Sequence, residues 1–220
     1  ISKSYIKWSL QMLFGISESI SHWGQYKSEK VAIVNNGVSY TYSELNSITN
    51  NIALALSEIK SNKIALAIKN KYLYLASIVG ANRSGKTVVF LNFHSSSEYI
   101  NTNIHDTSLD TLLCDDYFYN DYKNSPLILL KIEEFIHNNY DDKSSPEILL
   151  DSDHIFGVLF SSGTTGVPKG IERDNNSIVS ELIGWIIEMR LTSETIFCLG
   201  RPIFYTGGLV LSLSTLIVGG

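Results

Sequence analysis

The sequence is poor in the residues that form disulfide frameworks and metal centres. It has only two cysteines, Cys114 and Cys198, which lie far apart and in no metal-ligand spacing. The five histidines show neither a His-Glu-x-x-His pattern nor clustered ligand spacing, so we expect no metal site built from them. Because unpaired cysteines are usually interior, we expect both thiols to be buried, in a reducing cytoplasmic environment.

Runs of basic residues are also missing. The formal net charge is -5, and no cluster of Lys or Arg forms a basic stripe, which argues against a nucleic-acid partner. With 44% hydrophobic and 18% charged residues, the composition is that of an ordinary globular protein with a substantial core. Any bound phosphate must therefore be held by a local arrangement of donors.

No apolar run is long enough for a membrane span. The stretch GGLVLSLSTLIVGG at residues 207–220 suits a core helix, and residues 1–20 place Ile6, Leu10 and Leu13 at the spacing of an amphipathic surface helix. No small-residue cleavage pattern follows residues 1–20, so we do not expect a signal peptide. Since residues 207–220 lack a closing polar segment, we expect the sequence to be a piece of a longer protein.

The pattern of β-rich and helical segments predicts an α/β fold with a mostly parallel sheet flanked by helices. Asn35-Asn36-Gly37 predicts a hairpin turn, and Thr41 with Glu44 predicts a capping box that opens a helix. Strands at residues 63–68, 87–92 and 111–115 alternate with helices at 71–83 and 96–105. Residues 116–150 look like weak elements and loops. We therefore expect one βα series over residues 1–150 and a second over 151–220.

The stretch GANRSGKT, residues 80–87, matches the pattern of the phosphate-binding loop of P-loop NTPases. That loop must open a helix, so that the amides at the helix N-terminus face the phosphates. Here a helical segment precedes the glycines, and the strand-forming residues 88–91 follow Lys86 and Thr87. We therefore reject the P-loop assignment, and expect Lys86 to be an exposed turn residue whose replacement by alanine changes little.

The segment HIFGVLFSSGTTGVPKG, residues 154–170, carries the strongest chemical signal. An apolar strand leads into a loop of glycines, serines and threonines, and Lys169 stands at its far end. Glycines let a backbone wrap closely around an anion, hydroxyl and amide groups donate hydrogen bonds to it, and a Lys ammonium adds a positive charge. This pattern predicts a phosphate-binding loop rather than an ordinary surface turn.

SSGTTGVPKG closely resembles the phosphate-binding signature of the adenylate-forming (AMP-binding) enzymes, which include acyl-CoA synthetases, aryl-CoA ligases and the adenylation domains of peptide synthetases. Three weaker matches, SYTYSELN, GANRSGKTVVFLN and RPIFYTGGL, follow the motif order of that family. The resemblance covers nearly the whole chain. It implies the N-terminal portion of the large domain of such an enzyme.

The resemblance implies a ligase that uses ATP and Mg²⁺ to convert a small carboxylic acid into an acyl-adenylate, and then transfers the acyl group, with CoA as the acceptor we expect. It implies that the phosphates are held by the following residues: Ser161, Ser162, Gly163, Thr164, Thr165, Gly166 and Lys169. Tyr205 replaces the usual histidine of the later motif and becomes a candidate for the acyl pocket, although a core aromatic at a strand end is an alternative reading. Asp174 is interpreted as a helix N-cap.

Several motifs of the family are absent. The sequence contains no aromatic-Gly-x-Thr-Glu motif, ribose-binding Asp, hinge or C-terminal-domain Lys. We therefore expect that these 220 residues need the remainder of the enzyme chain and are inactive alone. PIFYTGG favours an acyl-CoA or aryl-CoA synthetase; the alternatives are an amino-acid adenylation domain and a short non-catalytic paralogue that binds a nucleotide or a partner.

Overall fold

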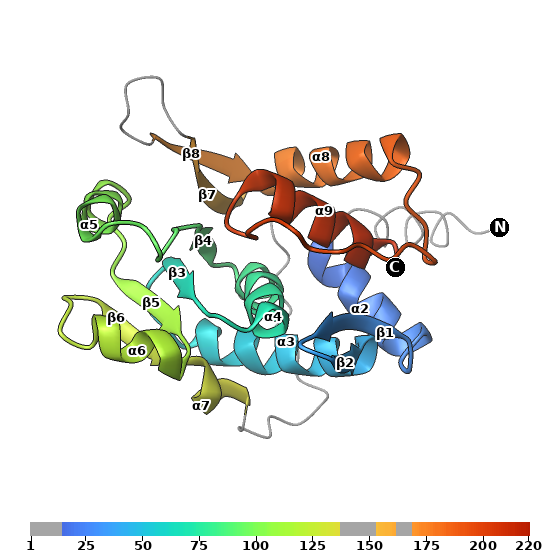
Figure 1. The fold of residues 1–220 in the computed structure, drawn as a ribbon, viewed down its shortest axis with the longest axis horizontal. Helices are drawn as coiled ribbons and strands as arrows, with labels where there is room; N and C mark the ends of the chain where they lie inside the picture. Colours follow the sequence, from blue (N-terminus) through green and yellow to red (C-terminus); the bar gives the residue numbers. More distant parts are fainter. Residues whose placement is uncertain (1–14, 137–152, 162–168) are drawn as a thin grey trace. The chain divides into compact units, whose positions relative to one another are not determined.

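Strands and helices alternate along most of the chain, as the sequence predicts. The structure, a computed structural model, describes residues 15–136, 153–161 and 169–220. Figure 1 shows its elements in chain order: α2 (Ile16–Tyr26), β1 (Val31–Asn35), β2 (Val38–Thr41), α3 (Tyr42–Ser57), β3 (Lys63–Ala67), α4 (Lys71–Arg83), β4 (Thr87–Val89), α5 (Ser97–Asp106), β5 (Thr111–Cys114), α6 (Asp116–Tyr122), β6 (Ile128–Lys131), α7 (Ile132–Ile136), β7 (Ile155–Ser161), β8 (Lys169–Asp174), α8 (Asn175–Glu188) and α9 (Thr206–Ile217).

The chain divides into two compact units, and the chain passes between them within α3 and at the start of α8. Unit 1 contains Ile1–Ser47 and Asn176–Gly220, and unit 2 contains Ile48–Asn175. This division groups residues by contacts and does not test the predicted organisation into two βα series, which stays a prediction.

Unit 2 contains a six-stranded, mostly parallel sheet, which confirms the predicted fold class. Its strand order is β6-β5-β3-β4-β7-β8. The first five strands pair in parallel, and β8 pairs antiparallel with β7. The apolar character of β3 and β5 explains their place inside the sheet, because a strand covered on both faces buries successive side chains.

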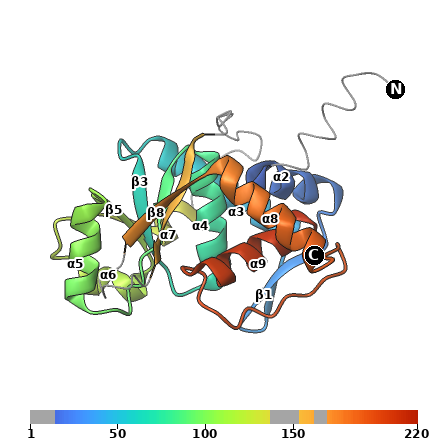
Figure 2. The same cartoon turned by 90° about the horizontal axis from the view of Figure 1, so that it is seen from above.

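Helices cover the sheet of unit 2 on both faces. One hydrophobic cluster joins alternate strand residues such as Ala65 and Leu112 to Ile100 of α5 and Phe118 of α6. Since side chains alternate along a strand, Ile64 points to the other face, and α4 packs against β3 and β4. Figure 2 shows α4 beside β3 when the fold is seen from above. Both layers of apolar side chains are therefore buried.

The sequence analysis missed one strand of the sheet and predicted another strand to be longer than it is. Residues 116–150, expected to be weak elements, include β6, whose four residues pair in register with β5. The strand expected over residues 87–92 pairs only over Thr87–Val89, although the amide of Phe90 still donates to the carbonyl of Val158 at 3.0 Å. Residues 137–152 lie outside the described residues.

The local signals near the N-terminus are confirmed. β1 and β2 form an antiparallel hairpin whose turn residue Asn36 has a φ of 51°. The backbone amide of Thr41 donates to the Glu44 carboxylate at 2.6 Å, and the amide of Glu44 donates to the Thr41 hydroxyl at 3.2 Å. These reciprocal bonds are the predicted capping box. Of the amphipathic helix expected over residues 1–20, residues 1–14 lie outside the described residues.

The C-terminal end of α9 organises unit 1. This helix is the core helix expected from residues 207–220, and most of its side chains are buried. Trp23 donates its indole N–H to the Ile217 carbonyl at 3.0 Å, the Tyr42 hydroxyl donates to the Leu216 carbonyl at 3.0 Å, and Lys30 donates to the Gly219 carbonyl at 2.6 Å. The last carbonyls of a helix lack partners within the helix. Side chains from the N-terminal part of unit 1 supply them.

The prediction that both cysteines are buried is correct for Cys114 and wrong for Cys198. Cys114 lies on β5 in the core, whereas Cys198 is exposed. Cys198 belongs to a segment after α8 that is not part of any described strand or helix. In the described part of the chain, none of the helices has the length and apolar character needed to cross a membrane.

The hydrogen bond from Tyr42 to α9 gives a test of unit 1. Replacing Tyr42 with Phe should lower the free energy of unfolding by about 1 kcal/mol, because it removes one donor from a buried helix terminus. Tyr26→Phe is the matched control, because Tyr26 is 66% exposed and should change the stability by less than about 0.5 kcal/mol. Urea denaturation of both variants measures the difference. Equal effects would show that the bond to α9 contributes nothing.

Candidate functional site

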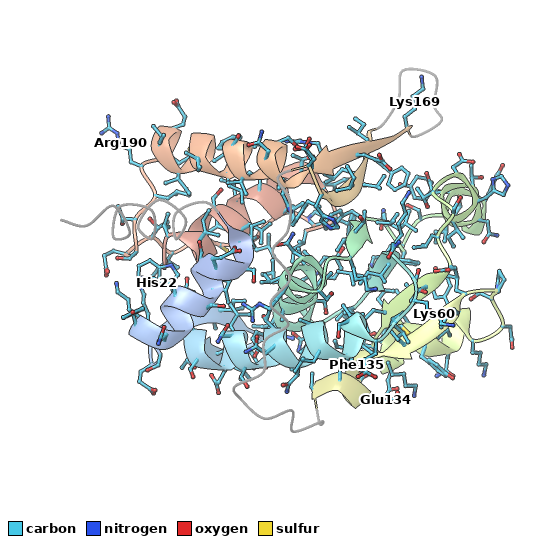
Figure 3. The ribbon with its side chains drawn as sticks, turned by 180° about the vertical axis from the view of Figure 1, so that it is seen from behind. His22, Lys60, Glu134, Phe135, Lys169 and Arg190 are labelled. Carbon is cyan, nitrogen blue, oxygen red and sulfur yellow. The ribbon has the colours of Figure 1, made fainter. Side chains whose placement is uncertain are left out.

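The strands β7 and β8 form a hairpin that holds the two ends of the predicted phosphate loop. Ser161, the last residue of β7, lies opposite Lys169, the first residue of β8, in the antiparallel register. Figure 3 shows Lys169 at the end of this hairpin. The predicted residues between them, namely Ser162, Gly163, Thr164, Thr165 and Gly166, lie outside the described residues. The structure therefore brings together the first and last members of the predicted site.

Lys169 is exposed, and no described residue forms an ion pair with its ammonium group. The nearby Glu172 of β8 lies 3.5 Å from Lys63 instead. An unpaired Lys at the mouth of a loop rich in hydroxyl groups can donate charge-assisted hydrogen bonds to an anion. The hairpin thus presents a cation where a phosphate would be expected.

The position of β7 depends on a close approach to β4. Gly157 is the register partner of Val88, and a Cβ atom at residue 157 would lie 2.5 Å from a ring carbon of Phe90 and 2.8 Å from the Val88 carbonyl oxygen. Distances below 3.0 Å are not tolerated between such atoms. Only glycine lets the two strands pair at this point. The ring of Phe90 also stacks on Phe156, with centroids 6.1 Å apart.

A second set of contacts fixes the start of β7. The Thr87 hydroxyl donates to the Ile155 carbonyl at 2.8 Å, and the amide of Asn175 donates to the His154 carbonyl at 2.9 Å. Burial lowers the pKa of the His154 imidazole, and a hydrogen bond with the backbone of Lys86 acts in the opposite direction. The strand that leads into the predicted phosphate loop is therefore attached to its neighbours at both its beginning and its centre.

The site lies at the carboxyl edge of the sheet. Because β4 and β7 are adjacent and parallel, the residues that follow β4 reach the same edge as the loop after β7. Ligands of open α/β sheets bind outside the carboxyl ends of the strands. Asn92 and His94 follow β4, and the Asn92 side chain accepts a hydrogen bond from the His94 amide at 3.1 Å. The sequence analysis gave these two residues no role, and the pairing of β4 with β7 was the missing information.

The structure confirms that residues 80–87 do not form a P-loop. They connect a helix to a strand. α4 ends at Arg83, Gly85 has a φ of 71°, and β4 begins at Thr87. The amide of Lys86 donates back to the Ala81 carbonyl at 2.8 Å. A left-handed glycine after a helix is the usual way to end it. The glycines at positions 80 and 85 therefore do not form an anion-binding turn at a helix N-terminus.

The expectation that Lys86 is exposed is wrong. Its exposed fraction is 6%, and its ammonium group donates to the Ile59 carbonyl at 2.6 Å. Burial lowers the pKa of Lys86. A long Lys side chain can bury its methylene stem while the amine finds a backbone partner. Lys86 thus has a structural role that the turn-like sequence around it did not indicate.

The second predicted site residue, Tyr205, lies in unit 1. It directly precedes α9 and is 50% exposed, so it is not a core aromatic. Its carbonyl accepts hydrogen bonds from the amides of Gly208 and Leu209, at 3.1 and 3.0 Å. The Tyr205 side chain is thus partly exposed at the N-terminal end of α9. Asp174 directly precedes α8, which is the position expected for an N-cap.

No part of the chain that the structure describes brings three or more His, Cys, Asp or Glu side chains together as a metal site. Among the described residues of the hairpin, Lys169 carries a charged group suited to an anion.

The AMP-binding enzyme family matches residues 20–220 of the chain. Two of its relatives are a 2-succinylbenzoate–CoA ligase from Bacillus velezensis and a D-alanine–D-alanyl carrier protein ligase from Streptococcus pneumoniae. The first is 22% identical over 89% of this chain and 41% of the relative. The second is 23% identical over 77% of this chain and 33% of the relative. The chain thus spans less than half the length of these two relatives.

Two solved structures share the fold. One is an o-succinylbenzoate CoA synthetase from Bacillus subtilis in complex with ATP and magnesium, with a TM-score of 0.79, 20% identity, and coverage of 91% of this chain and 43% of that one. The other is the N-terminal subdomain of NpsA from Klebsiella oxytoca, with a TM-score of 0.81 and 19% identity. This second match covers 94% of this chain and 52% of that subdomain. At these identities the likeness shows the fold alone.

The contact between Gly157 and Phe90 predicts a strong effect of a single methyl group. Gly157→Ala should lower the free energy of unfolding by roughly 1 to 3 kcal/mol, because the added Cβ overpacks the contact with β4. Gly184→Ala is the matched control: residue 184 lies on α8 with open space around it, so alanine should stabilise the helix by roughly 0.5 to 1 kcal/mol. Denaturant titrations of both variants test the opposite signs, and a stabilised Gly157→Ala variant would contradict the argument.

Proposed function

The chain belongs to the AMP-binding enzyme family, and on this basis we propose that it is the N-terminal part of an ATP-dependent enzyme that activates a carboxylic acid as its adenylate. The observation that carries the proposal is the hairpin that holds Ser161 opposite Lys169 at the carboxyl edge of the sheet. The family match supports the proposed reaction class, and the hairpin supports the proposed position of the phosphates.

In the proposed reaction, an oxygen of the substrate carboxylate attacks the α-phosphorus of ATP, and pyrophosphate leaves. Catalysis of such a displacement depends mainly on positioning and on stabilising negative charge. The loop from Ser161 to Lys169 would hold the β- and γ-phosphates through hydroxyl groups, amides and the Lys169 ammonium. Mg²⁺ would be shared by the phosphates; the related synthetase in complex with ATP and magnesium supports this cofactor pair.

CoA is the proposed acceptor of the acyl group. RPIFYTGGL is closer to the CoA ligase branch, and the 2-succinylbenzoate–CoA ligase relative supports this assignment. The D-alanine–D-alanyl carrier protein ligase supports the alternative, in which an amino acid is activated for a carrier protein. Tyr205, exposed at the start of α9, is the candidate for contact with the acyl group. We expect the enzyme to work in the cytoplasm.

Pyrophosphate release by the longer protein, measured across a panel of aromatic acids, fatty acids and amino acids, tests this function. Release with an aromatic or fatty acid, followed by thioester formation with CoA, is the expected result. Release only with amino acids would favour the carrier-protein alternative. No release with any acid would favour a non-catalytic paralogue that binds a nucleotide or a partner.

The 220-residue chain by itself should form no acyl-adenylate. The motifs that the family uses for the adenine, the ribose and the C-terminal Lys are not in this sequence. Exchange of labelled pyrophosphate into ATP is the measurement, with the longer protein as the positive control. Exchange above background by the 220-residue chain, with any carboxylate, would contradict this expectation.

A variant of Lys169 and a control variant of Lys86 together test whether Lys169 binds the phosphates. In the longer protein, Lys169→Ala should lower kcat/KM for ATP by roughly tenfold to a hundredfold, because a charge-assisted contact with the triphosphate is worth roughly 1.5 to 3 kcal/mol. Lys86→Met should leave ATP use unchanged and lower the free energy of unfolding by about 1 kcal/mol, because it removes the bond to the Ile59 carbonyl.

The same pair can be measured on the 220-residue chain by calorimetric titration with tripolyphosphate. The Lys169→Ala variant should bind it more weakly, and the Lys86→Met variant should bind it like the unmodified chain. The reverse result, loss of ATP use or of tripolyphosphate binding only at Lys86, would identify the segment around residue 86 as the nucleotide loop and refute the assignment.

A further inference from the structure

The end of the β7–β8 hairpin that carries Lys169 reaches beyond the neighbouring strand β4. β4 pairs with β7 as far as Val158, whose carbonyl accepts a hydrogen bond from the Phe90 amide at 3.0 Å, whereas β7 continues to Ser161. Beyond Val158, the strand that the structure describes beside β7 is β8. A two-stranded ribbon is marginally stable unless it packs against another element such as a helix. The loop end of the hairpin therefore needs side-chain contacts with the rest of unit 2.

An ion pair joins β8 to another strand of the sheet. The carboxylate of Glu172 lies 3.5 Å from the ammonium group of Lys63 on β3. The Lys63 and Glu172 side chains are 35% and 55% exposed, and water screens ion pairs of this kind, so that they add little to stability. Other contacts must therefore hold the first residues of β8.

An aromatic ring packs across the two strands directly beside Lys169. Phe160 and Gly170 are register partners, next to the pair of Ser161 and Lys169. A Cβ atom at residue 170 would lie 3.4 Å from a ring carbon of Phe160 and 3.0 Å from a methyl carbon of Val158. The Phe160 ring thus lies close to the backbone of Gly170. In a sheet, an aromatic side chain that covers a cross-strand glycine replaces the contacts that the glycine lacks.

Tyr99 of α5 packs against the same ring. The centroids of the Tyr99 and Phe160 rings are 6.4 Å apart, with an angle of 65° between the planes, which is an edge-to-face arrangement. Both side chains are partly buried against the core cluster that includes Ile100. In Figures 1 and 2 the beginning of β8 lies toward α5. A series of contacts therefore runs from α5 through Phe160 to Gly170, the residue that follows Lys169.

The backbone of Tyr99 is held on both sides. The Tyr99 amide donates to the hydroxyl of the N-cap residue Ser96 at 3.3 Å, and the buried side chain of Asn103 donates to the Tyr99 carbonyl at 2.7 Å. The next residue, Ile100, is 4% exposed in the core. Since the first turn of α5 is fixed in this way, the Tyr99 ring can serve as a support for the hairpin.

We propose that Tyr99 is a positioning residue for Lys169. Its ring holds Phe160, Phe160 covers Gly170, and the beginning of β8 is thereby placed where the Lys169 ammonium group reaches a phosphate. A small displacement of a binding group can cost much of its contribution, even when the mutated residue is remote from the ligand. The inference rests on the proposed phosphate-binding role of Lys169 and adds a residue from outside the loop, which acts through Phe160 and Gly170.

The test is binding of tripolyphosphate by the longer protein, measured by calorimetric titration. Tyr99→Ala should weaken binding by roughly tenfold, because the Phe160 ring loses its support and the hairpin end can move. Tyr99→Phe keeps the ring and should restore binding. Tyr99→Leu keeps an apolar side chain without the ring, should bind as weakly as Tyr99→Ala, and replaces that variant if alanine prevents folding.

Ile104→Ala is the matched control that separates positioning from a loss of stability. Ile104 also lies on α5 and packs against the same core cluster. Its truncation should lower the Tm, as Tyr99→Ala does, because both remove apolar contacts with the core. It should leave tripolyphosphate binding unchanged. Equal weakening of binding by Ile104→Ala and Tyr99→Ala would show that only the stability of α5 matters, and would overturn the proposal.

A double variant tests whether Tyr99 acts through Lys169. In a protein that already carries Lys169→Ala, the change Tyr99→Ala should weaken binding little further, because its effect requires the ammonium group. Independent effects of the two changes would refute the positioning role and leave the phosphate assignment intact, as would unchanged binding by Tyr99→Ala and Tyr99→Leu. If Lys169→Ala alone binds tripolyphosphate like the unmodified protein, the phosphate assignment is wrong and the positioning role is wrong with it.

Discussion

The close pairing of β7 with β4 is the constraint on which the candidate site depends. A parallel ladder normally tolerates most apolar residues, but here the ring of Phe90 occupies the space where residue 157 would place a Cβ atom. Glycine resolves this conflict and permits the Val88 and Gly157 pairing. Since β7 leads directly into the predicted phosphate loop, the position of Ser161 follows from a contact four residues earlier. The position of the first residue of the predicted loop thus depends on the packing of the sheet.

Unit 1 depends on a different kind of constraint, the unsatisfied carbonyls at the end of a buried helix. α9 has no charged residue in its last turn, so it lacks the common basic side chain that would supply a donor from within the helix. Trp23, Lys30 and Tyr42 supply donors from elements that come much earlier in the chain. Three side chains between residues 23 and 42 are therefore bonded to the C-terminal end of α9 by the hydrogen-bonding requirement of one helix terminus.

Local patterns in the sequence were sufficient to predict most of the elements. The capping box at Thr41, the helix over residues 71–83 and the mostly parallel sheet follow from side-chain periodicity and turn chemistry, which act over a few residues. The burial of Lys86 could not be predicted in this way, because its partner is the carbonyl of Ile59, a residue separated from it by a strand and a helix. The same reason explains why Asn92 and His94 were overlooked: their relation to the loop exists only through the pairing of β4 with β7.

Cys198 was assigned wrongly for a related reason. Its neighbours are apolar, and an apolar neighbourhood in sequence normally indicates burial. In the structure those neighbours belong to a segment after α8 that is not part of any described strand or helix, and the nearby Ile196 is 96% exposed. The local sequence thus favours burial, while the contacts of the described residues leave Cys198 exposed. An apolar sequence neighbourhood therefore predicts burial of a residue only where another part of the fold packs against it, and the sequence alone does not specify that packing.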